Sequence, residues 1–396
     1  MPLPFQNILI YEDELARSKR FLPLTYTRSV AELRSGAMTG IERMRRLYPE
    51  AAIYLHCRKE LADVLRKRYG LPVNEVPKGE SLLVNARAAV CADAVGESYL
   101  RANLTSELTQ ALLAGEPFDP YTGAPNAFTI GSIWELVLQN SVALVRDSKF
   151  LKSGWRRRVD ANSLQDVATR NFDQLYLHPR ATIGADVVLD CTDGPIMIEE
   201  GAHIMPHSTI IGPVYIGRNS IVKIGSKIYG GTTIGPVSKV GGEIENSIIQ
   251  GYSNKQHDGY LGHSFLGEWV NLGAGTNTSD LKNDYSPVRV TIEGESFDTG
   301  SLFVGLLMGD HSKSAIGTQF NTGTAIGVSC NIFGSGFPPK WIPSFSWGGA
   351  SEVTSYRYEK AIEVAKAVMA RREIIMTAED EAMLRQIFIS RQQIDI

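Results

Sequence analysis

The segment richest in chemically capable side chains is centred on His257, within Asn254–Asn283. An imidazole ordinarily titrates at about pH 6.5 and exchanges protons near neutral pH. Asp258 follows directly, but neighbouring residues on a strand face opposite ways, so we do not expect a dyad. For a histidine taken alone, the alternative interpretation is a surface residue in a loop.

The chain around this segment repeats aliphatic residues at every sixth position. Glycine is concentrated there too, with 28 of the 37 glycines between residues 181 and 350. A period of six fits neither a 3.6-residue helix nor an alternating strand, but it fits a coil of three short strands. We therefore predict a parallel β-helix over 176–335 rather than a glycine-rich β-sandwich. The unbroken series is Ile198, Ile204, Ile210, Ile216, Val222, Ile228, Ile234 and Val240.

Two interruptions of this repeat flank the histidine segment. The strict spacing is lost over 241–259, and 276–291 has the composition of an inserted loop. Interruptions of a solenoid lie on its surface and often carry the binding face. We expect the functional site next to them.

A longer motif surrounds His257. The histidine lies three residues before Tyr260-Leu261-Gly262, and Val270-Asn271-Leu272-Gly273-Ala274-Gly275-Thr276 follows. This pattern resembles the acetyltransferase domain of the bifunctional glucosamine-1-phosphate N-acetyltransferase/N-acetylglucosamine-1-phosphate uridylyltransferase family. The resemblance implies a left-handed β-helix. It covers about 160 residues as a repeat and about 30 as a specific motif.

The resemblance also implies roles for individual residues. His257 would be the general base that deprotonates an amine attacking acetyl-CoA. Tyr260 and Asn271 would hold the sugar phosphate and the acetyl-transfer site. Asp280 stands where the family has asparagine, which replaces an amide donor with a carboxylate and leaves the acceptor sugar open. We also assign Lys255, Lys282 and Asn283 as phosphate or loop contacts. The backbone N–H groups of Gly273 and Gly275 are assigned as donors to the thioester carbonyl.

Family members bind the acyl donor between neighbouring solenoids, so the resemblance predicts a homotrimer. Trp269, beside the motif, has the character of a buried interface residue.

In the N-terminal part, short apolar runs typical of buried strands alternate with segments of helical pattern. Such alternation predicts a mainly parallel α/β sheet, and the resemblance implies a nucleotidyltransferase-like domain over 1–160. The predicted strands are 7–11, 51–57 and 81–86, and the predicted helices are 39–47, 59–68 and 132–147.

The glycine-rich loop of that family is missing here. Its place is taken by a segment that contains Arg28, Arg34 and Gly36, which resembles a divergent bacterial branch of sugar nucleotidyltransferases. Both arginines are assigned to a triphosphate site, with structural ion pairs as the alternative. Asn85 replaces the family's magnesium-binding aspartate, and we assign Asn85 and Arg87 to the same site. Mg²⁺ is expected from the resemblance, with its ligands unassigned.

Composition restricts the remaining classes. The net charge of −3 disfavours a nucleic-acid scaffold, no apolar run reaches the roughly 18–20 residues of a membrane span, and no secretory signal is recognised. We expect a cytoplasmic protein. Residues 350–396 carry helical patterns and are expected to cap the solenoid, with Thr377 and Asp380 beginning the last helix.

Three functions follow as hypotheses. The first is a bifunctional enzyme that N-acetylates a hexosamine 1-phosphate and transfers a nucleotidyl group from UTP to give a UDP-N-acetylhexosamine. The second is an acyltransferase whose first domain binds a nucleotide sugar without turnover. The third is a non-catalytic regulatory subunit. His257, Tyr260 and Asn271 argue against the third, while Asn85 keeps the second open.

Overall fold

The N-terminal domain is built on a four-stranded sheet in the order β4-β1-β5-β6. The computed structural model describes residues 5–90, 100–102, 104–120, 129–151 and 166–394. Strands β1, β4 and β5 are parallel, as predicted, while β6 is antiparallel to β5. The bounds are β1 (Asn7–Tyr11), β4 (Ala52–Leu55), β5 (Ser81–Asn85) and β6 (Leu100–Ala102), with helices α1 (Gly40–Leu47), α2 (Ala62–Tyr69), α3 (Ala86–Ala89) and α4 (Ser106–Ala114).

The C-terminal part is a parallel β-helix whose three sides are sheets of six, nine and ten strands in the described part of the chain. The first side contains β7 (Val167–Arg170), β10 (Val187–Asp190), β13 (Thr209–Ile211), β16 (Lys227–Ile228), β19 (Glu243–Glu245) and β22 (Tyr260–Gly262). The second contains β8 (Leu175–Leu177), β11 (Ile196–Ile198), β14 (Val214–Ile216), β17 (Thr232–Ile234), β20 (Ile248–Gly251), β23 (Phe265–Glu268), β28 (Leu307–Met308), β31 (Ala325–Ile326) and β33 (Trp341–Ile342). The third contains β9 (Thr182–Ile183), β12 (His203–Ile204), β15 (Ile221–Val222), β18 (Lys239–Val240), β21 (Asn254–Lys255), β24 (Asn271–Leu272), β29 (Lys313–Ser314), β32 (Asn331–Ile332), β34 (Ser346–Gly348) and β35 (Val353–Ser355).

The six-residue repeat forms the interior of this coil. All eight aliphatic side chains from Ile198 to Val240 are at most 1% exposed and belong to one hydrophobic core. The coil begins at Val167 and its last parallel strand ends at Gly348, so it extends past both ends of 176–335.

The first interruption of the repeat is a change of side length rather than an end of the coil. After Val240 the inward positions are Ile244, Ile249, Lys255 and Leu261. The first of these steps is two residues shorter than six and the second is one residue shorter, after which the six-residue spacing returns. Lys255 pairs in register with Val240 and therefore occupies an inward position.

The second interruption extends past the predicted 276–291. It includes an antiparallel hairpin, β26 (Arg289–Ile292) and β27 (Glu295–Asp298), between the short paired strands β25 (Asn277–Thr278) and β30 (Gln319–Phe320). The hairpin contacts the N-terminal domain: the Tyr26 hydroxyl donates to Glu293 at 2.5 Å, and the rings of Phe297 and Trp134 are 5.8 Å apart. The insertion therefore joins the two domains.

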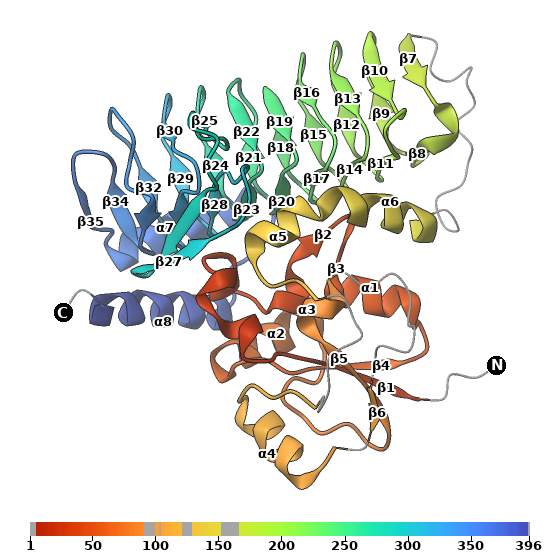
Figure 1. Cartoon of the computed structure of the whole chain (residues 1–396), viewed down its shortest axis with the longest axis vertical. Helices are drawn as coiled ribbons and strands as arrows, with labels where there is room; N and C mark the ends of the chain where they lie inside the picture. Colours follow the sequence, from red (N-terminus) through yellow and green to blue (C-terminus); the bar gives the residue numbers. More distant parts are fainter. Residues whose placement is uncertain (1–4, 91–99, 103, 121–128, 152–165, 395–396) are drawn as a thin grey trace.

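The N-terminal domain packs along the nine-stranded side of the β-helix. That sheet is buried on both faces, with Leu266 inside the coil and its neighbour Phe265 in the core shared with the N-terminal domain. Helices α5 (Ile133–Leu138) and α6 (Asn140–Leu151) lie between the two parts (Figure 1). They replace the single predicted helix over 132–147.

The C-terminal segment forms helices α7 (Tyr358–Ala370) and α8 (Ala378–Ile394). The predicted start of α8 is confirmed, because Thr377 Oγ1 accepts from the Asp380 N–H at 3.1 Å and the Asp380 carboxylate accepts from the Thr377 N–H at 3.2 Å. Helix α8 begins at the N-terminal domain, where Asp380 lies 3.6 Å from Arg68, and ends beside the last coils of the β-helix (Figure 1), where Arg391 donates to the Phe345 carbonyl at 2.6 Å. In the described residues, no helix combines the length and apolarity of a membrane span.

Candidate functional site

His257 lies in an exposed turn at an edge of the β-helix, between β21 of the ten-stranded side and β22 of the six-stranded side. Two hydrogen bonds hold the turn: the Gly275 N–H donates to the Asp258 carbonyl at 3.1 Å, and Lys255 Nζ donates to the His257 carbonyl at 2.7 Å. Gly259 closes the turn at φ +119°, and a Cβ there would lie 2.1 Å from the Thr276 carbonyl oxygen. The sequence thus needs glycine at this position.

Lys255 supports the turn from inside the coil. Its side chain is 2% exposed and occupies a position that is aliphatic in the adjoining coil. Burial lowers the pKa of its amine to about 8, against the opposing attraction of Asp258. The structure therefore shows Lys255 holding the His257 backbone.

Lys255 is expected to make stability depend on pH above about 8. Its folded-state pKa of about 8 lies below the ordinary lysine value of 10.5, so between these values the unfolded chain binds more protons and stability rises with pH. The cost of burying the charged amine applies fully below pH 8 and is gone above 10.5. Relative to Lys255→Met, wild type should gain up to about 3 kcal/mol over this interval.

Urea unfolding of both proteins at several pH values measures this gain. The exposed Lys227, which pairs with Glu243 at 3.3 Å, provides a control as Lys227→Met. A stability difference between Lys255→Met and wild type that stays constant from pH 8 to 10.5 would contradict the assignment.

A group of acidic and aromatic side chains lies on the six-stranded side next to the turn. The Tyr260 hydroxyl is 2.9 Å from Asp280 Oδ2 and 3.0 Å from Glu245 Oε2, and His263 Nδ1 is 2.7 Å from the same Asp280 oxygen. Burial and the two carboxylates raise the pKa of Tyr260, so its phenol stays neutral. The structure thus brings the predicted residues Tyr260 and Asp280 together and adds Glu245 and His263.

Glu245 and His263 were missed from the sequence. His263 has no assigned role in the motif, and Glu245 lies outside it. The signal for Glu245 is register: it pairs with Gly262, 17 residues and one coil later.

Asn271 lies on a different side of the prism from Tyr260. It belongs to β24 of the ten-stranded sheet, where its Oδ1 is 3.4 Å from Asn254 Nδ2. The His257 turn therefore stands between the two predicted substrate contacts. Asn283 is exposed in the insertion, and Lys282 Nζ donates to the Pro287 carbonyl at 2.7 Å within the same loop.

The backbone N–H groups of Gly273 and Gly275, expected to polarise the thioester carbonyl, make hydrogen bonds within the protein. The Gly273 N–H donates to the Ser314 carbonyl, and the Gly275 N–H donates to the Asp258 carbonyl, each at 3.1 Å. Both groups belong to the contacts between successive coils, so neither is directed at a ligand.

The two arginines assigned to triphosphate are instead engaged by protein acceptors. Arg28 is 1% exposed and its guanidinium lies 2.5 Å from Asp310 and 3.2 Å from Glu268, both in the β-helix. Arg34 donates to the Ala37 carbonyl at 2.7 Å and lies 3.2 Å from Glu42. This geometry matches the ion-pair alternative.

Gly36 has the positive φ of +63° that favours glycine, in the turn between β2 (Arg34–Ser35) and β3 (Met38–Thr39). Its N–H donates to Asn140 Oδ1 at 2.7 Å. The Gly36 N–H is therefore engaged within the protein, like the two arginines of the same segment.

Asn85 ends β5 at the carboxyl edge of the sheet, Arg87 follows it in α3, and both contact Asp13. Asn85 Nδ2 donates to Asp13 Oδ2 at 2.8 Å, and Arg87 lies 2.5 Å from the same carboxylate. Burial would raise the pKa of Asp13, but Arg87 and Asn85 together keep it below its ordinary value.

The described residues at this edge do not fit the expected Mg²⁺. The Asp13 carboxylate is committed to Arg87 and Asn85, and Glu12 lies 3.3 Å from Arg17. Within the described ranges, no three His, Cys, Asp or Glu side chains are grouped as a metal site.

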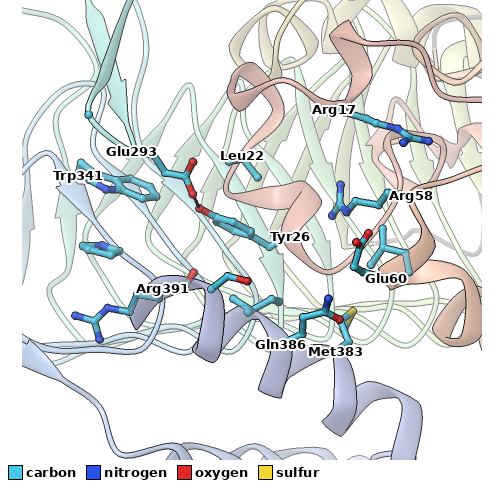
Figure 2. Close-up of a pocket in the computed structure, with 16 residues that line it drawn as sticks. Arg17, Leu22, Tyr26, Arg58, Glu60, Glu293, Trp341, Met383, Gln386 and Arg391 are labelled. Atoms are coloured by element: carbon cyan, nitrogen blue, oxygen red, sulfur yellow. Dashed lines mark hydrogen bonds between the residues drawn. The ribbon is translucent and has the colours of Figure 1, made fainter. Parts of the chain in front are cut away.

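A pocket of about 720 Å³ opens beside the ends of β1 and β4. Arg17 follows β1, Arg58 follows β4, and Figure 2 shows these two arginines across the pocket from Trp341 and Glu293. Helix α8 supplies one wall. None of the predicted nucleotide contacts lines this pocket, whose residues come from five separated parts of the chain.

Comparison with known proteins finds a family model and several similar proteins. A family model described as sugar nucleotidyl transferase matches residues 8–156. The bifunctional protein GlmU of Methanococcus aeolicus is 31% identical over 198 residues, which are 50% of this chain and 46% of that protein. A bifunctional sugar-1-phosphate nucleotidylyltransferase/acetyltransferase of Sulfurisphaera tokodaii is 33% identical over 142 residues, 35% of each chain. This chain thus spans less than half the length of these curated relatives.

Proposed function

We propose that this chain, which resembles the bifunctional sugar-1-phosphate nucleotidylyltransferase/acetyltransferases, prepares a UDP-N-acetylhexosamine in two steps. One step acetylates the amine of a hexosamine 1-phosphate with acetyl-CoA. The other joins the sugar phosphate to the uridylyl group of UTP and releases pyrophosphate. The observation that carries the proposal is one chain holding both the nucleotidyl transferase match over 8–156 and the His257 turn on a β-helix.

His257 is the proposed general base of the acetyl transfer. As the sugar nitrogen attacks the thioester carbon, the imidazole takes its proton, the new C–N bond forms and the C–S bond breaks. The leaving thiolate then recovers a proton from the imidazolium. The nearby carboxylates of Glu245 and Asp280 support an amine acceptor, because negative charge beside the turn attracts an ammonium group.

A homotrimer remains our proposal for the assembly, but Trp269 does not support it. Trp269 is 7% exposed and stacks on Tyr252 at 4.5 Å, so the chain itself buries it. Better support comes from Ile224 and Ile316, which are 59% and 79% exposed in the turns after β15 and β29. Both turns follow strands of the ten-stranded side, as the His257 turn does, so a neighbouring copy that covered the isoleucines would lie against His257.

For the uridylyl transfer, we propose that UTP binds in the pocket beside β1 and β4. Nucleotides bind outside the carboxyl ends of parallel strands, and the pocket is within the usual ligand-site range of about 300–1,000 Å³. Trp341 offers a ring for the base, and Arg17 and Arg58 offer positive charge for the phosphates, although Arg17 also lies 3.3 Å from Glu12 and Arg58 also donates to the Thr25 carbonyl. We also infer action in the cytoplasm, where UTP and acetyl-CoA are available.

Arg58→Met is expected to weaken UTP binding by about 1.5–3 kcal/mol, the range for a hydrogen bond to a charged group. Calorimetric titration with UTP measures this, and Arg34→Met is the comparison, since the Arg34 side chain is engaged by Glu42 and Ala37. If only Arg34→Met weakened UTP binding, the triphosphate site would lie in the segment that contains Arg28 and Arg34, as the sequence predicted. No UTP binding by wild type, with acetyl transfer intact, would favour the acyltransferase-only alternative.

A further inference from the structure

A second cavity, of about 300 Å³, lies where the end of α7 meets the ten-stranded side of the β-helix. Four cationic side chains line it: Lys239 of β18, Lys313 of β29, and Arg371 and Arg372 just after α7. No carboxylate lines it, and in the described part of the chain none of the four forms an ion pair with an acid.

Burial, together with neighbouring cations at Lys239 and Arg372, disfavours the charged form of three of these side chains. Burial and the neighbouring Arg372, Lys223 and Arg371 lower the pKa of Lys239, and burial lowers that of Lys313 to about 8. Burial and Arg371 also lower the pKa of Arg372. An anion in the cavity would remove the repulsion.

Structural roles account for only part of the cluster. The C-terminal end of α7 has a partial negative charge, which explains cations at Arg371 and Arg372. Arg372 also donates to Asn254 Oδ1 at 3.0 Å, and Lys313 Nζ donates to the His311 carbonyl at 2.7 Å. Lys239 and Lys313 come from separate strands and line the same cavity. The negative charge of the helix end does not explain these two additional cations.

The cavity adjoins the His257 turn. Gln256, the residue before His257, lines it, and so does Asn271. The stacked rings of Tyr252 and Trp269, 4.5 Å apart, form an apolar wall. A ligand held here lies next to the proposed general base.

We propose that this cavity binds the phosphate or pyrophosphate group of an acetyl-transfer substrate, through Lys239, Lys313, Arg371 and Arg372. The inference rests on the proposed function for the identity of the ligand, whereas the anion site itself rests on the cavity. The group belongs either to the sugar 1-phosphate or to CoA, and the two sources are separated by the test.

Calorimetric titration of the full chain with inorganic pyrophosphate, glucosamine 1-phosphate and CoA tests the site. Lys239→Met and Arg372→Met should each weaken pyrophosphate binding about tenfold or more, the factor for one charged hydrogen bond. Lys239→Arg should retain most of the affinity. Lys360→Met is the matched control, because Lys360 lies on the same helix, is exposed and pairs with Glu363.

Weaker binding of glucosamine 1-phosphate in the two variants assigns the site to the acceptor, and weaker binding of CoA assigns it to the donor. His257→Ala should bind pyrophosphate like wild type. The anion site can therefore be tested even if His257 is not the general base. Affinities for all three ligands within twofold of wild type in both folded variants, or no binding by wild type at millimolar concentration, would overturn the site.

Discussion

His257→Ala is expected to lower thiol release from acetyl-CoA by about 10²–10⁴-fold, the usual contribution of a general base. With N-acetylglucosamine 1-phosphate supplied as the acceptor, pyrophosphate release from UTP should stay near the wild-type rate, because the proposed nucleotide pocket lies between the N-terminal domain, the hairpin and α8. The exposed side chain has no packing role, so the melting temperature should not move.

A histidine elsewhere on the β-helix provides the control. His207 is exposed, has a φ of +60° and lies 3.5 Å from Asp186, so His207→Asn keeps a residue that tolerates this backbone. Thiol release should be unchanged in it. His257→Ala with more than about half of the wild-type acetyl-transfer rate would remove His257 as the base.

Arg28→Met is expected to cost about 3–5 kcal/mol of stability, the usual cost of removing one partner of a buried ion pair. Asp310, which is 4% exposed, would keep its hydrogen bonds from Thr27 Oγ1 at 2.7 Å and the Glu268 N–H at 2.9 Å but lose its cation. Because Arg28 belongs to the N-terminal domain and Asp310 to the β-helix, the loss should weaken their junction.

The urea midpoint measures this effect. Arg180→Met is the matched control, since Arg180 is exposed and pairs with Glu200 on the surface, where an ion pair contributes at most about 1 kcal/mol. Arg28→Met/Asp310→Asn should recover part of the loss by removing the uncompensated charge. An Arg28→Met midpoint equal to wild type would show that the pair does not hold the domains together.

The repeat could be predicted from sequence because one physical constraint sets it. Each side of the coil needs one inward apolar side chain, and the buried series from Ile198 to Val240 follows directly. The continuation of the coil past Val240 was not recognised from the sequence, because Lys255 occupies an inward position without being apolar. The register of adjoining coils, visible only in the structure, recovers it.

The candidate site was less predictable because its parts meet across distant segments. Arg28 contacts residues 240 and 282 positions away, so nothing near it in the sequence identifies its partners. Tyr260 and Asn271 belong to one continuous motif, yet the strand order assigns them to different sides of the prism. The basic cavity likewise joins strands of the β-helix to the end of α7.

The most direct test of the central claim is one assay with purified protein, glucosamine 1-phosphate, N-acetylglucosamine 1-phosphate, acetyl-CoA and UTP, in which free thiol and pyrophosphate are followed separately. The account predicts release of both products by wild type, loss of thiol release alone in His257→Ala, and loss of pyrophosphate release alone in Arg58→Met. Release of neither product by wild type, or of both products undiminished in the two variants, would contradict it.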